Sequence, residues 1–196
     1  MRKLIVILPV LALLAFSNAY SQAVSAAPSQ GGKALLFEFS GLSNLGANAY
    51  EGGIGGKYFL SDQTALRVML LFGMSNHNNA SGNGTKDDSV QFGLSAGLEY
   101  HFPISTSVSP YVGGGIYAAS GDIKNSNFHG VTKGTYTTLG VGVAAGVEYF
   151  FNKNISLAGE YQFGLSATNS TGTGVPSQQD LTLGFQTADL TLGVYF

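Results

Sequence analysis

Few side chains in this sequence of 196 residues could support acid–base or nucleophilic catalysis. The possible groupings of a base with an acid or a nucleophile are His77 with Asp87 or Asp88, and His129 with Asp122 and Ser126. Such groups catalyse a reaction only if the fold holds them within hydrogen-bonding distance of one another. No motif in the sequence places them together, so we expect no catalytic residue and a protein that is not an enzyme.

Metal and cofactor sites are not indicated either. The spacing of His77, His101 and His129 does not match that of zinc ligands. Cys is absent, which excludes thiolate metal sites, disulfides and a Cys nucleophile. The glycine-rich stretches at 113–121 and 140–145 can be aligned with a dinucleotide-binding fingerprint, but neither begins a helix. We therefore expect no metal and no cofactor.

The composition is unusual for a water-soluble domain. Charged residues make up 10% of the chain, whereas typical usage is about 25%. Apolar residues make up 44%, and there are 28 Gly and only 5 Pro. Without Arg2 and Lys3 at the N-terminus, 7 basic and 11 acidic residues remain, a net charge of −4. No basic patch indicates a nucleic-acid partner.

The N-terminus has the pattern of a secretory signal peptide. A basic MRK precedes the apolar run 4–16, which is shorter than the roughly 20 residues of a membrane-spanning helix. Small residues follow, and the possible cleavage sites lie after Ala19, Ala23, Ala26 or Ala27. We expect residues 1–27 to be the signal peptide and 28–196 to be one domain. An uncleaved membrane anchor is the alternative.

The rest of the chain alternates apolar with small or polar residues, which is the period of a β-strand with two different faces. Eight such runs are predicted near 33–42, 48–60, 65–75, 89–102, 109–120, 135–150, 155–167 and 187–196. Several reach the 9–11 residues or so of a transmembrane strand. Short turns at 61–64, 103–108 and 151–154 alternate with long polar connections at 76–88, 121–133 and 167–180.

Charged side chains fall on the face of these strands that lacks the continuous apolar residues. They are Glu38, Lys57, Arg67, Glu99, Glu148, Glu160 and Asp189. If the sheet closes into a barrel, these charges face a narrow interior, where they must pair or form hydrogen bonds. We expect a structural polar network, with Arg67 as the main cation beside Glu99, Glu148 and Glu160, and with Lys57 as an auxiliary cation. A gated ion path is the alternative.

The C-terminus is a strand, DLTLGVYF, that ends on an aromatic residue. Its apolar face carries Leu190, Leu192, Val194 and Phe196. Just before it, residues 181–185 have the opposite parity, so either a bulge near Gln186–Thr187 switches the face or these residues rise above the membrane. A final strand of this kind can close a sheet against the first strand, which leaves no edge unpaired.

With its signal peptide, alternating strands, two series of turns and terminal Phe, the chain resembles the small outer-membrane β-barrels of Gram-negative bacteria, such as OmpX, OmpW and the OmpA transmembrane domain. The resemblance implies an all-β fold, an eight-stranded antiparallel up-and-down transmembrane β-barrel in the outer membrane with both termini in the periplasm. It implies contact with outer-membrane lipid and, during biogenesis, with periplasmic chaperones and the barrel-assembly machinery, which would read Leu190, Leu192, Val194 and Phe196.

The function expected from these features is a non-enzymatic, monomeric barrel with surface loops for structural or interaction roles. The sequence names no extracellular partner. Three alternatives stay open: a narrow pore for ions or small molecules, a lipid-modifying outer-membrane enzyme, and a secreted lipocalin-like binding barrel. The last would need an apolar interior and a polar exterior, whereas the alternation here favours lipid outside and polar groups inside.

Overall fold

The computed structural model describes residues 29–40, 49–79, 85–102, 105–127, 130–173 and 175–196. The predicted signal peptide lies outside these ranges, as do residues 43–47 between the first two predicted strands, so the signal peptide stays a prediction. In the part of the chain that is described, no helix is long and apolar enough to cross a membrane.

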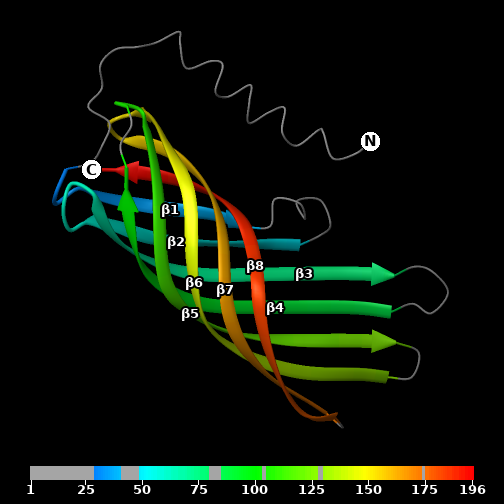
Figure 1. Cartoon of the computed structure of the whole chain (residues 1–196). Helices are drawn as coiled ribbons and strands as arrows, with labels where there is room; N and C mark the ends of the chain where they lie inside the picture. The colour runs from blue at the N-terminus through cyan, green and yellow to red at the C-terminus, as the bar shows by residue number, and fades with distance from the viewer. Residues whose placement is uncertain (1–28, 41–48, 80–84, 103–104, 128–129, 174) are drawn as a thin grey trace, which may run out of the picture.

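Eight antiparallel strands form a closed barrel, which confirms the predicted fold (Figure 1). The strands are β1 (Lys33–Ser40), β2 (Ala49–Phe59), β3 (Thr64–Asn79), β4 (Thr85–His101), β5 (Val108–Asn127), β6 (Gly130–Asn152), β7 (Ile155–Gly172) and β8 (Val175–Tyr195). Each strand pairs with the next along the chain, and β8 also pairs with β1, with Tyr195 opposite Ala34. The C-terminal strand is thus paired on both sides, which removes the edge that a free terminal strand would expose.

The alternation along each strand separates an outer face from an inner one. On β3, Leu70 and Met74 are 60% and 61% exposed, whereas Ala65 and Met69 are 0% and 1% exposed. Exposed apolar residues recur in the same way on the other strands. Because the period of a strand is two residues, the sequence alone places each of these side chains outside or inside.

The barrel has a turn end and a hairpin end. The turn end carries the short connections at 60–63, 102–107 and 153–154, near the C-terminus (Figure 1). Side chains cap these turns: Ser61 Oγ accepts a hydrogen bond from the Thr64 amide at 3.0 Å, and Asn152 Oδ1 accepts one from the Asn154 amide at 2.8 Å. At the opposite, hairpin end, β3 to β8 project in pairs.

The prediction of three long loops at this hairpin end is wrong. The residues that separate the paired strands are only 80–84, 128–129 and 173–174. Asn, Ser, Gly and Thr indicate loops by composition, but beyond the lipid an antiparallel ladder can keep polar side chains on both faces while its backbone stays paired. Hydroxyl groups even pair across the ladder: Thr135 and Thr171 lie 3.0 Å apart, as do Thr138 and Thr168 at 2.9 Å.

The change of parity in β8 is a bulge. Tyr161 pairs with Ala188, and two residues later Phe163 pairs with Phe185, so β8 contains one extra residue between these pairs. This places the irregularity at Gln186–Thr187 and confirms the first of the two alternatives. Beyond the bulge, Leu181 and Leu183 are 74% and 68% exposed and share the outer face with the even-numbered residues nearer the C-terminus.

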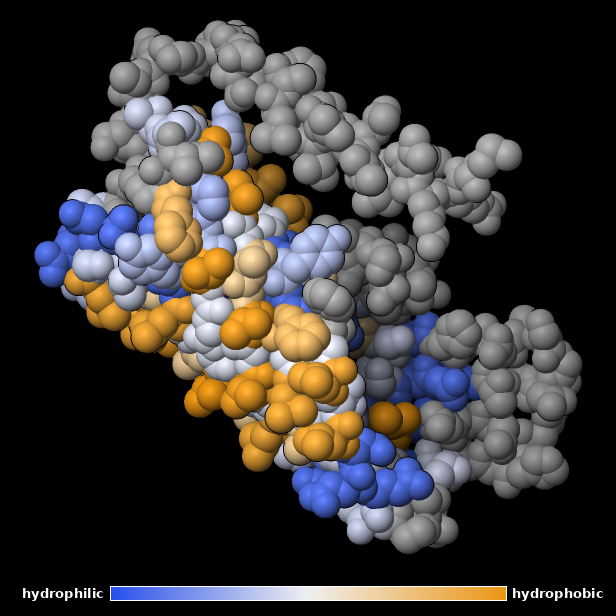
Figure 2. All heavy atoms as spheres, in the orientation of Figure 1, coloured by the Kyte–Doolittle hydropathy of each residue, from blue (hydrophilic) through white to orange (hydrophobic). Residues whose placement is uncertain are grey.

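The outer surface carries an apolar band. Figure 2 shows hydrophobic side chains across the flank of the barrel, with hydrophilic residues toward both ends. Aromatic residues gather on the outer face at the turn end: Tyr58, Tyr100, Phe102, Phe151 and Phe196 are between 41% and 78% exposed. This matches the aromatic girdle expected at a membrane interface.

Candidate functional site

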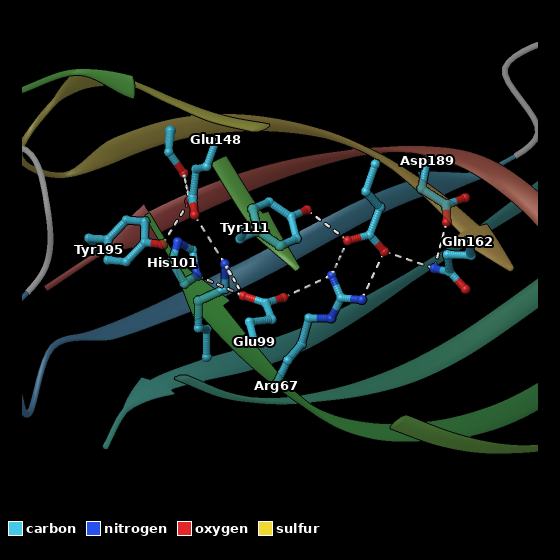
Figure 3. A network of polar contacts seen from close by, with 11 residues as sticks. Arg67, Glu99, His101, Tyr111, Glu148, Gln162, Asp189 and Tyr195 are labelled. Carbon is cyan, nitrogen blue, oxygen red and sulfur yellow. Dashed lines mark hydrogen bonds and ion pairs between the residues drawn. The ribbon is translucent and has the colours of Figure 1, made fainter. Parts of the chain in front are cut away.

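All seven charged residues predicted to face the interior lie inside the barrel. The carboxylate residues Glu38, Glu99, Glu148, Glu160 and Asp189 are at most 5% exposed, as is Lys57, and the Arg67 side chain is 16% exposed. Each stands on the inner face of its strand because of the alternation described above. Figure 3 shows that many of them meet in one polar network across the lumen.

Lys57 on β2 binds two carboxylates at the centre of this network. Its Nζ lies 2.7 Å from Glu99 Oε2 on β4 and 3.1 Å from Glu148 Oε2 on β6. All three side chains are at most 3% exposed. The ammonium therefore links strands on different sides of the barrel, far from solvent.

Arg67 on β3 forms the second cationic centre. Its Nη1 and Nη2 donate to the two oxygens of Glu160 at 2.9 and 2.8 Å, a bidentate geometry that suits the planar guanidinium. Nη1 also lies 3.1 Å from Glu99 Oε1, an ion pair without hydrogen-bond geometry. Lys57 and Arg67 are directly opposite in the β2–β3 register, and Glu99 bridges these two like charges.

The arrangement differs from the sequence expectation in one respect. Glu148 pairs with Lys57 rather than with Arg67, so Lys57 is as central as Arg67. The physical reason is the position of each residue along the barrel axis. The alternation of side chains places a residue inside the barrel, but the register between strands that are distant in sequence decides which charges lie at the same level and meet. The paired layer of Lys57, Arg67, Glu99, Glu148 and Glu160 has two basic and three acidic groups.

Neutral side chains complete the hydrogen bonds of these carboxylates. Tyr111 donates to Glu160 at 2.7 Å, and Tyr195 and Ser156 donate to Glu148 at 2.7 and 2.5 Å. Tyr111 can lie there because its neighbour across the ladder is Gly146, where a Cβ would collide with the tyrosine ring.

His101 belongs to the same layer. Its Nε2 lies 3.1 Å from Glu99 Oε2 and its Nδ1 lies 3.1 Å from Ser109 Oγ. The ring also stacks on Tyr111 with centroids 5.1 Å apart and packs beside Phe59 at the same distance. At the turn end, Phe59, Phe150, Tyr195 and neighbouring apolar side chains fill the interior. We did not predict roles for His101, Tyr111 or Tyr195 from the sequence, although their inward parity was a signal.

Glu38 and Asp189 lie toward the hairpin end of the network. Asp189 accepts a hydrogen bond at 2.7 Å from Gln162, which also donates to Glu160 at 2.8 Å (Figure 3). The Ser40 hydroxyl lies 3.4 Å from Glu38, and no described cation comes within ion-pair distance of the Glu38 carboxylate. The structure thus brings five of the predicted residues into direct ion pairs, joins Asp189 through Gln162, and leaves Glu38 at the margin.

A cavity of about 350 Å³ lies on the hairpin side of the ionic layer. Its polar lining includes Glu38, Arg67, Gln91, Gln162 and Asp189, and glycines of β4 to β6 line much of the remaining wall. Nearer the hairpin end, Tyr136 donates a hydrogen bond to Gln91 at 2.8 Å. The lumen is therefore a polar vestibule that ends at a layer of paired charges.

The possible catalytic groupings do not form a described site. His77 is opposite Asp87 in the β3–β4 register, but its side chain lies outside what the structure describes, as do His129 and the side chain of Ser126. Asp88 instead pairs with Lys86 at 3.2 Å, exposed to solvent. Among the described residues, no three His, Asp or Glu side chains form a group that could hold a metal ion.

A closed eight-stranded barrel with an apolar outside, an aromatic girdle and a charged interior defines a small transmembrane β-barrel of the outer-membrane type. Sequence comparison agrees: the chain belongs to the outer membrane protein beta-barrel domain family, whose model matches residues 8–196. It is therefore a protein of the bacterial outer membrane. A secreted lipocalin-like barrel is excluded, because the polar and apolar faces have the opposite arrangement.

Solved structures show the same fold. OprG from Pseudomonas aeruginosa is 14% identical with a TM-score of 0.54, and the match covers 87% of this chain and 99% of that one. Ail, the attachment invasion locus protein of Yersinia pestis, is 18% identical with a TM-score of 0.53, covering 85% and 99%. A major outer membrane protein from Thermus thermophilus is 11% identical with a TM-score of 0.51, covering 85% and 100%. No curated protein matches the sequence.

We expect the mature protein to remain in the membrane fraction after carbonate extraction and to migrate differently in SDS gels before and after boiling. A closed barrel has no strand edge from which unfolding can start easily, so the unheated form stays folded in SDS. A single mobility at all temperatures, or recovery in the soluble periplasm, would contradict a closed barrel in lipid.

Proposed function

We propose that this protein is a non-enzymatic outer-membrane barrel whose lumen is closed by its own side chains and whose hairpin end serves structural or interaction roles outside the cell. The observation that carries this proposal is the ionic layer. Lys57 and Arg67 are each held by two carboxylates, and the aromatic side chains of the turn end lie directly beyond them. An eight-stranded barrel has an interior just wide enough for such side chains.

The projecting hairpins support the interaction role. Strands β3 to β8 continue past the apolar band as paired, polar ladders, which present an ordered surface beyond the lipid. By analogy with transmembrane barrels in general, the short turns face the periplasm and this hairpin end faces outward. The name of Ail associates that neighbour with attachment and invasion, and its likeness to the present chain is one of fold.

Biogenesis and assembly complete the proposal. Leu190, Leu192, Val194 and Phe196 share the outer face of the last strand. We propose that the barrel-assembly machinery reads this aromatic-terminated strand after periplasmic chaperones deliver the chain. Because β8 already pairs with β1 in the same chain, the barrel closes without a second copy, in keeping with a monomer.

A narrow pore is the second candidate, and the vestibule is the observation that favours it. The cavity of about 350 Å³ ends at Arg67 and Glu99, so a rearrangement of the ionic layer together with the aromatic side chains beyond it would extend the cavity toward the periplasm. A lipid-modifying enzyme has weaker support, because the described residues bring no base and nucleophile together at the hairpin end.

The closed-lumen proposal predicts that the purified protein in planar bilayers shows no steady ionic current above that of protein-free bilayers. It also predicts no hydrolysis or acyl transfer with outer-membrane phospholipids as substrate. Glu38→Gln is the matched test of the pore, because Glu38 lines the vestibule but lies outside the direct ion pairs. A cation-carrying pore would show a current in the wild type that this variant reduces, and that result would replace the closed barrel with the pore.

A further inference from the structure

Two lysines face each other on the outer surface near the hairpin end. Lys124 on β5 is directly opposite Lys133 on β6. Both are exposed, and both have the parity of the outward-facing residues of their strands, such as Ile116 and Leu139. Like charges directly opposite on one face of a ladder destabilise it. An anion bound between the two ammonium groups would therefore relieve their repulsion.

No described carboxylate lies within ion-pair distance of either Lys124 or Lys133, although two acids stand nearby. Asp88 is opposite Lys124 in the β4–β5 register, but it pairs with Lys86 at 3.2 Å. Asp122 lies two residues before Lys124 on the same face. Among the residues that the structure describes, Lys86, Lys124 and Lys133 are the only Lys or Arg residues beyond the ionic layer toward the hairpin end. All three fall on the outer face of neighbouring strands, where Asp88 and Asp122 leave a net charge of +1, and Asp87 has the inward parity of β4.

An apolar groove lies on the same flank of the barrel. Its volume is about 440 Å³, and its lining is almost entirely hydrophobic. Small side chains form its floor, namely Ala96, Ala118 and Ala167, and larger ones such as Leu94, Ile116, Leu139, Leu165 and Leu181 form its rims. One row of register partners runs through the groove from β4 to β8, namely Leu94, Ala118, Leu139, Ala167 and Leu181. The groove therefore crosses neighbouring strands, on the turn-end side of the two lysines.

The separation between lysines and groove fits the two parts of a lipid. Lys124 stands six residues beyond Ala118 on β5, which is about 20 Å along a strand and about 15 Å along the membrane normal for a strand tilted by about 40°. Ala118 pairs with Leu139, four residues from Val143 in the middle of the apolar band, so the groove lies about 10 Å from the bilayer midplane, within a hydrocarbon half of about 15 Å. The lysines lie about 10 Å beyond the edge of the hydrocarbon, at the level of the headgroups. A headgroup at the lysines would thus place acyl carbons in the groove.

We propose that this flank is a binding site for one phosphate-bearing, acylated lipid of the outer leaflet. The phosphate lies between Lys124 and Lys133, Lys86 stands at its edge, and an acyl chain occupies the groove over Ala118. A protein partner suits this surface less well, because the groove lies within the apolar band of a chain that spans the outer membrane. The orientation assumed here, with the hairpin end outside, is that of the proposed function.

The test is retention of a defined lipid by the folded barrel. The wild type, in non-ionic detergent, is mixed with bis-phosphorylated lipid A and analysed by native mass spectrometry. The double variant Lys124→Gln/Lys133→Gln is compared with Lys33→Gln/Lys153→Gln, which removes the same charge at the turn end. We expect the apparent affinity to fall about 10- to 30-fold in the first variant, from about 1 kcal/mol for each lysine near an anionic lipid, and to stay unchanged in the second.

Two further comparisons separate the parts of the site. Dephosphorylated lipid A, with the same acyl chains, should be retained as weakly by the wild type as the intact lipid is by the lysine variant. Ala118→Trp should weaken retention by filling the groove, whereas Ala145→Trp, on the outer face of β6 but outside the groove, should not. Inorganic phosphate at millimolar concentration should not displace the lipid.

The proposal is overturned if both lysine variants retain the phosphorylated lipid equally, or if removal of the phosphates has no effect. Displacement by inorganic phosphate would show a simple anion site and would also overturn it. Every variant is first checked for the heat-dependent gel mobility of a folded barrel, so that lost binding is not confused with lost folding. These outcomes are independent of the conductance test, because neither lysine lines the vestibule.

Discussion

Replacing Arg67 with alanine is expected to lower the free energy of unfolding by about 3–5 kcal/mol, the usual cost of breaking a buried ion pair by removing one partner. The guanidinium donates both hydrogen bonds of a bidentate pair with Glu160 and also neutralises Glu99. These two carboxylate side chains are 1% and 3% exposed. Without Arg67, Glu160 would keep only its hydrogen bonds from Tyr111 and Gln162, and Lys57 alone would face the surplus negative charge.

The measurement is reversible unfolding by denaturant in lipid vesicles, compared with Lys86→Ala. Lys86 also forms an ion pair, with Asp88 at 3.2 Å, but the two side chains are 49% and 32% exposed. Exposed pairs contribute only about 0–1 kcal/mol, so this variant isolates the effect of burial. Arg67→Lys should fall between the two, because it keeps the charge and loses the bidentate geometry. Equal, small losses for Arg67→Ala and Lys86→Ala would mean that water enters the layer and that the lumen is not closed.

Placing an arginine at Val143 is expected to destabilise the barrel by about 2–4 kcal/mol, the cost measured for Arg or Lys at the bilayer midplane of transmembrane barrels. Val143 lies on β6 within the apolar band and is 59% exposed. A charge at such an exposed position would be well tolerated if the side chain faced water, but it is destabilising where the side chain faces hydrocarbon. Leu94→Arg on β4, 51% exposed, should behave in the same way.

The matched control is Thr137→Arg, the same substitution on the same strand and face. Thr137 is six residues from Val143, about 15 Å toward the hairpin end along the normal of a membrane crossed at a tilt of about 40°. The cost there should be about 0–1 kcal/mol, as at a membrane interface. The same vesicle-based unfolding serves both. If Val143→Arg and Thr137→Arg were equally tolerated, the outer face at Val143 would not meet lipid.

The sequence by itself determined the class of the fold and the face of nearly every residue. Successive side chains of a strand alternate between its two faces. The sequence therefore indicates that Leu70 and Met74 point outward and that Lys57 and Glu99 point inward, whichever strands pair with theirs. The same pattern fixed the number of strands. Charge is scarce, and within the predicted apolar strands it falls on one face, which was enough to indicate lipid outside, because hydrocarbon excludes charge wherever the strand exposes it.

The tertiary structure decided which of the inward-facing charges pair with one another. Lys57 and Glu148 are 91 residues apart in sequence, and Arg67 and Glu160 are 93 apart, so their heights in the barrel depend on every intervening register and on the tilt of the strands. For this reason the sequence could name the interior charges but not their pairs, and Glu148 was placed beside the wrong cation.

Local composition also gave way to long-range pairing at the hairpin end. Thr168 and Thr171 lie in the stretch 167–180 that was predicted to be a loop, yet both belong to β7, because the neighbouring strand satisfies their backbone groups and their hydroxyls. The bulge at Gln186–Thr187 was one of two possibilities until the pairing of β7 with β8 selected it. The opposition of Lys124 and Lys133 follows from register as well. Sequence therefore set which side each group faces, and closure of the barrel set what each group meets.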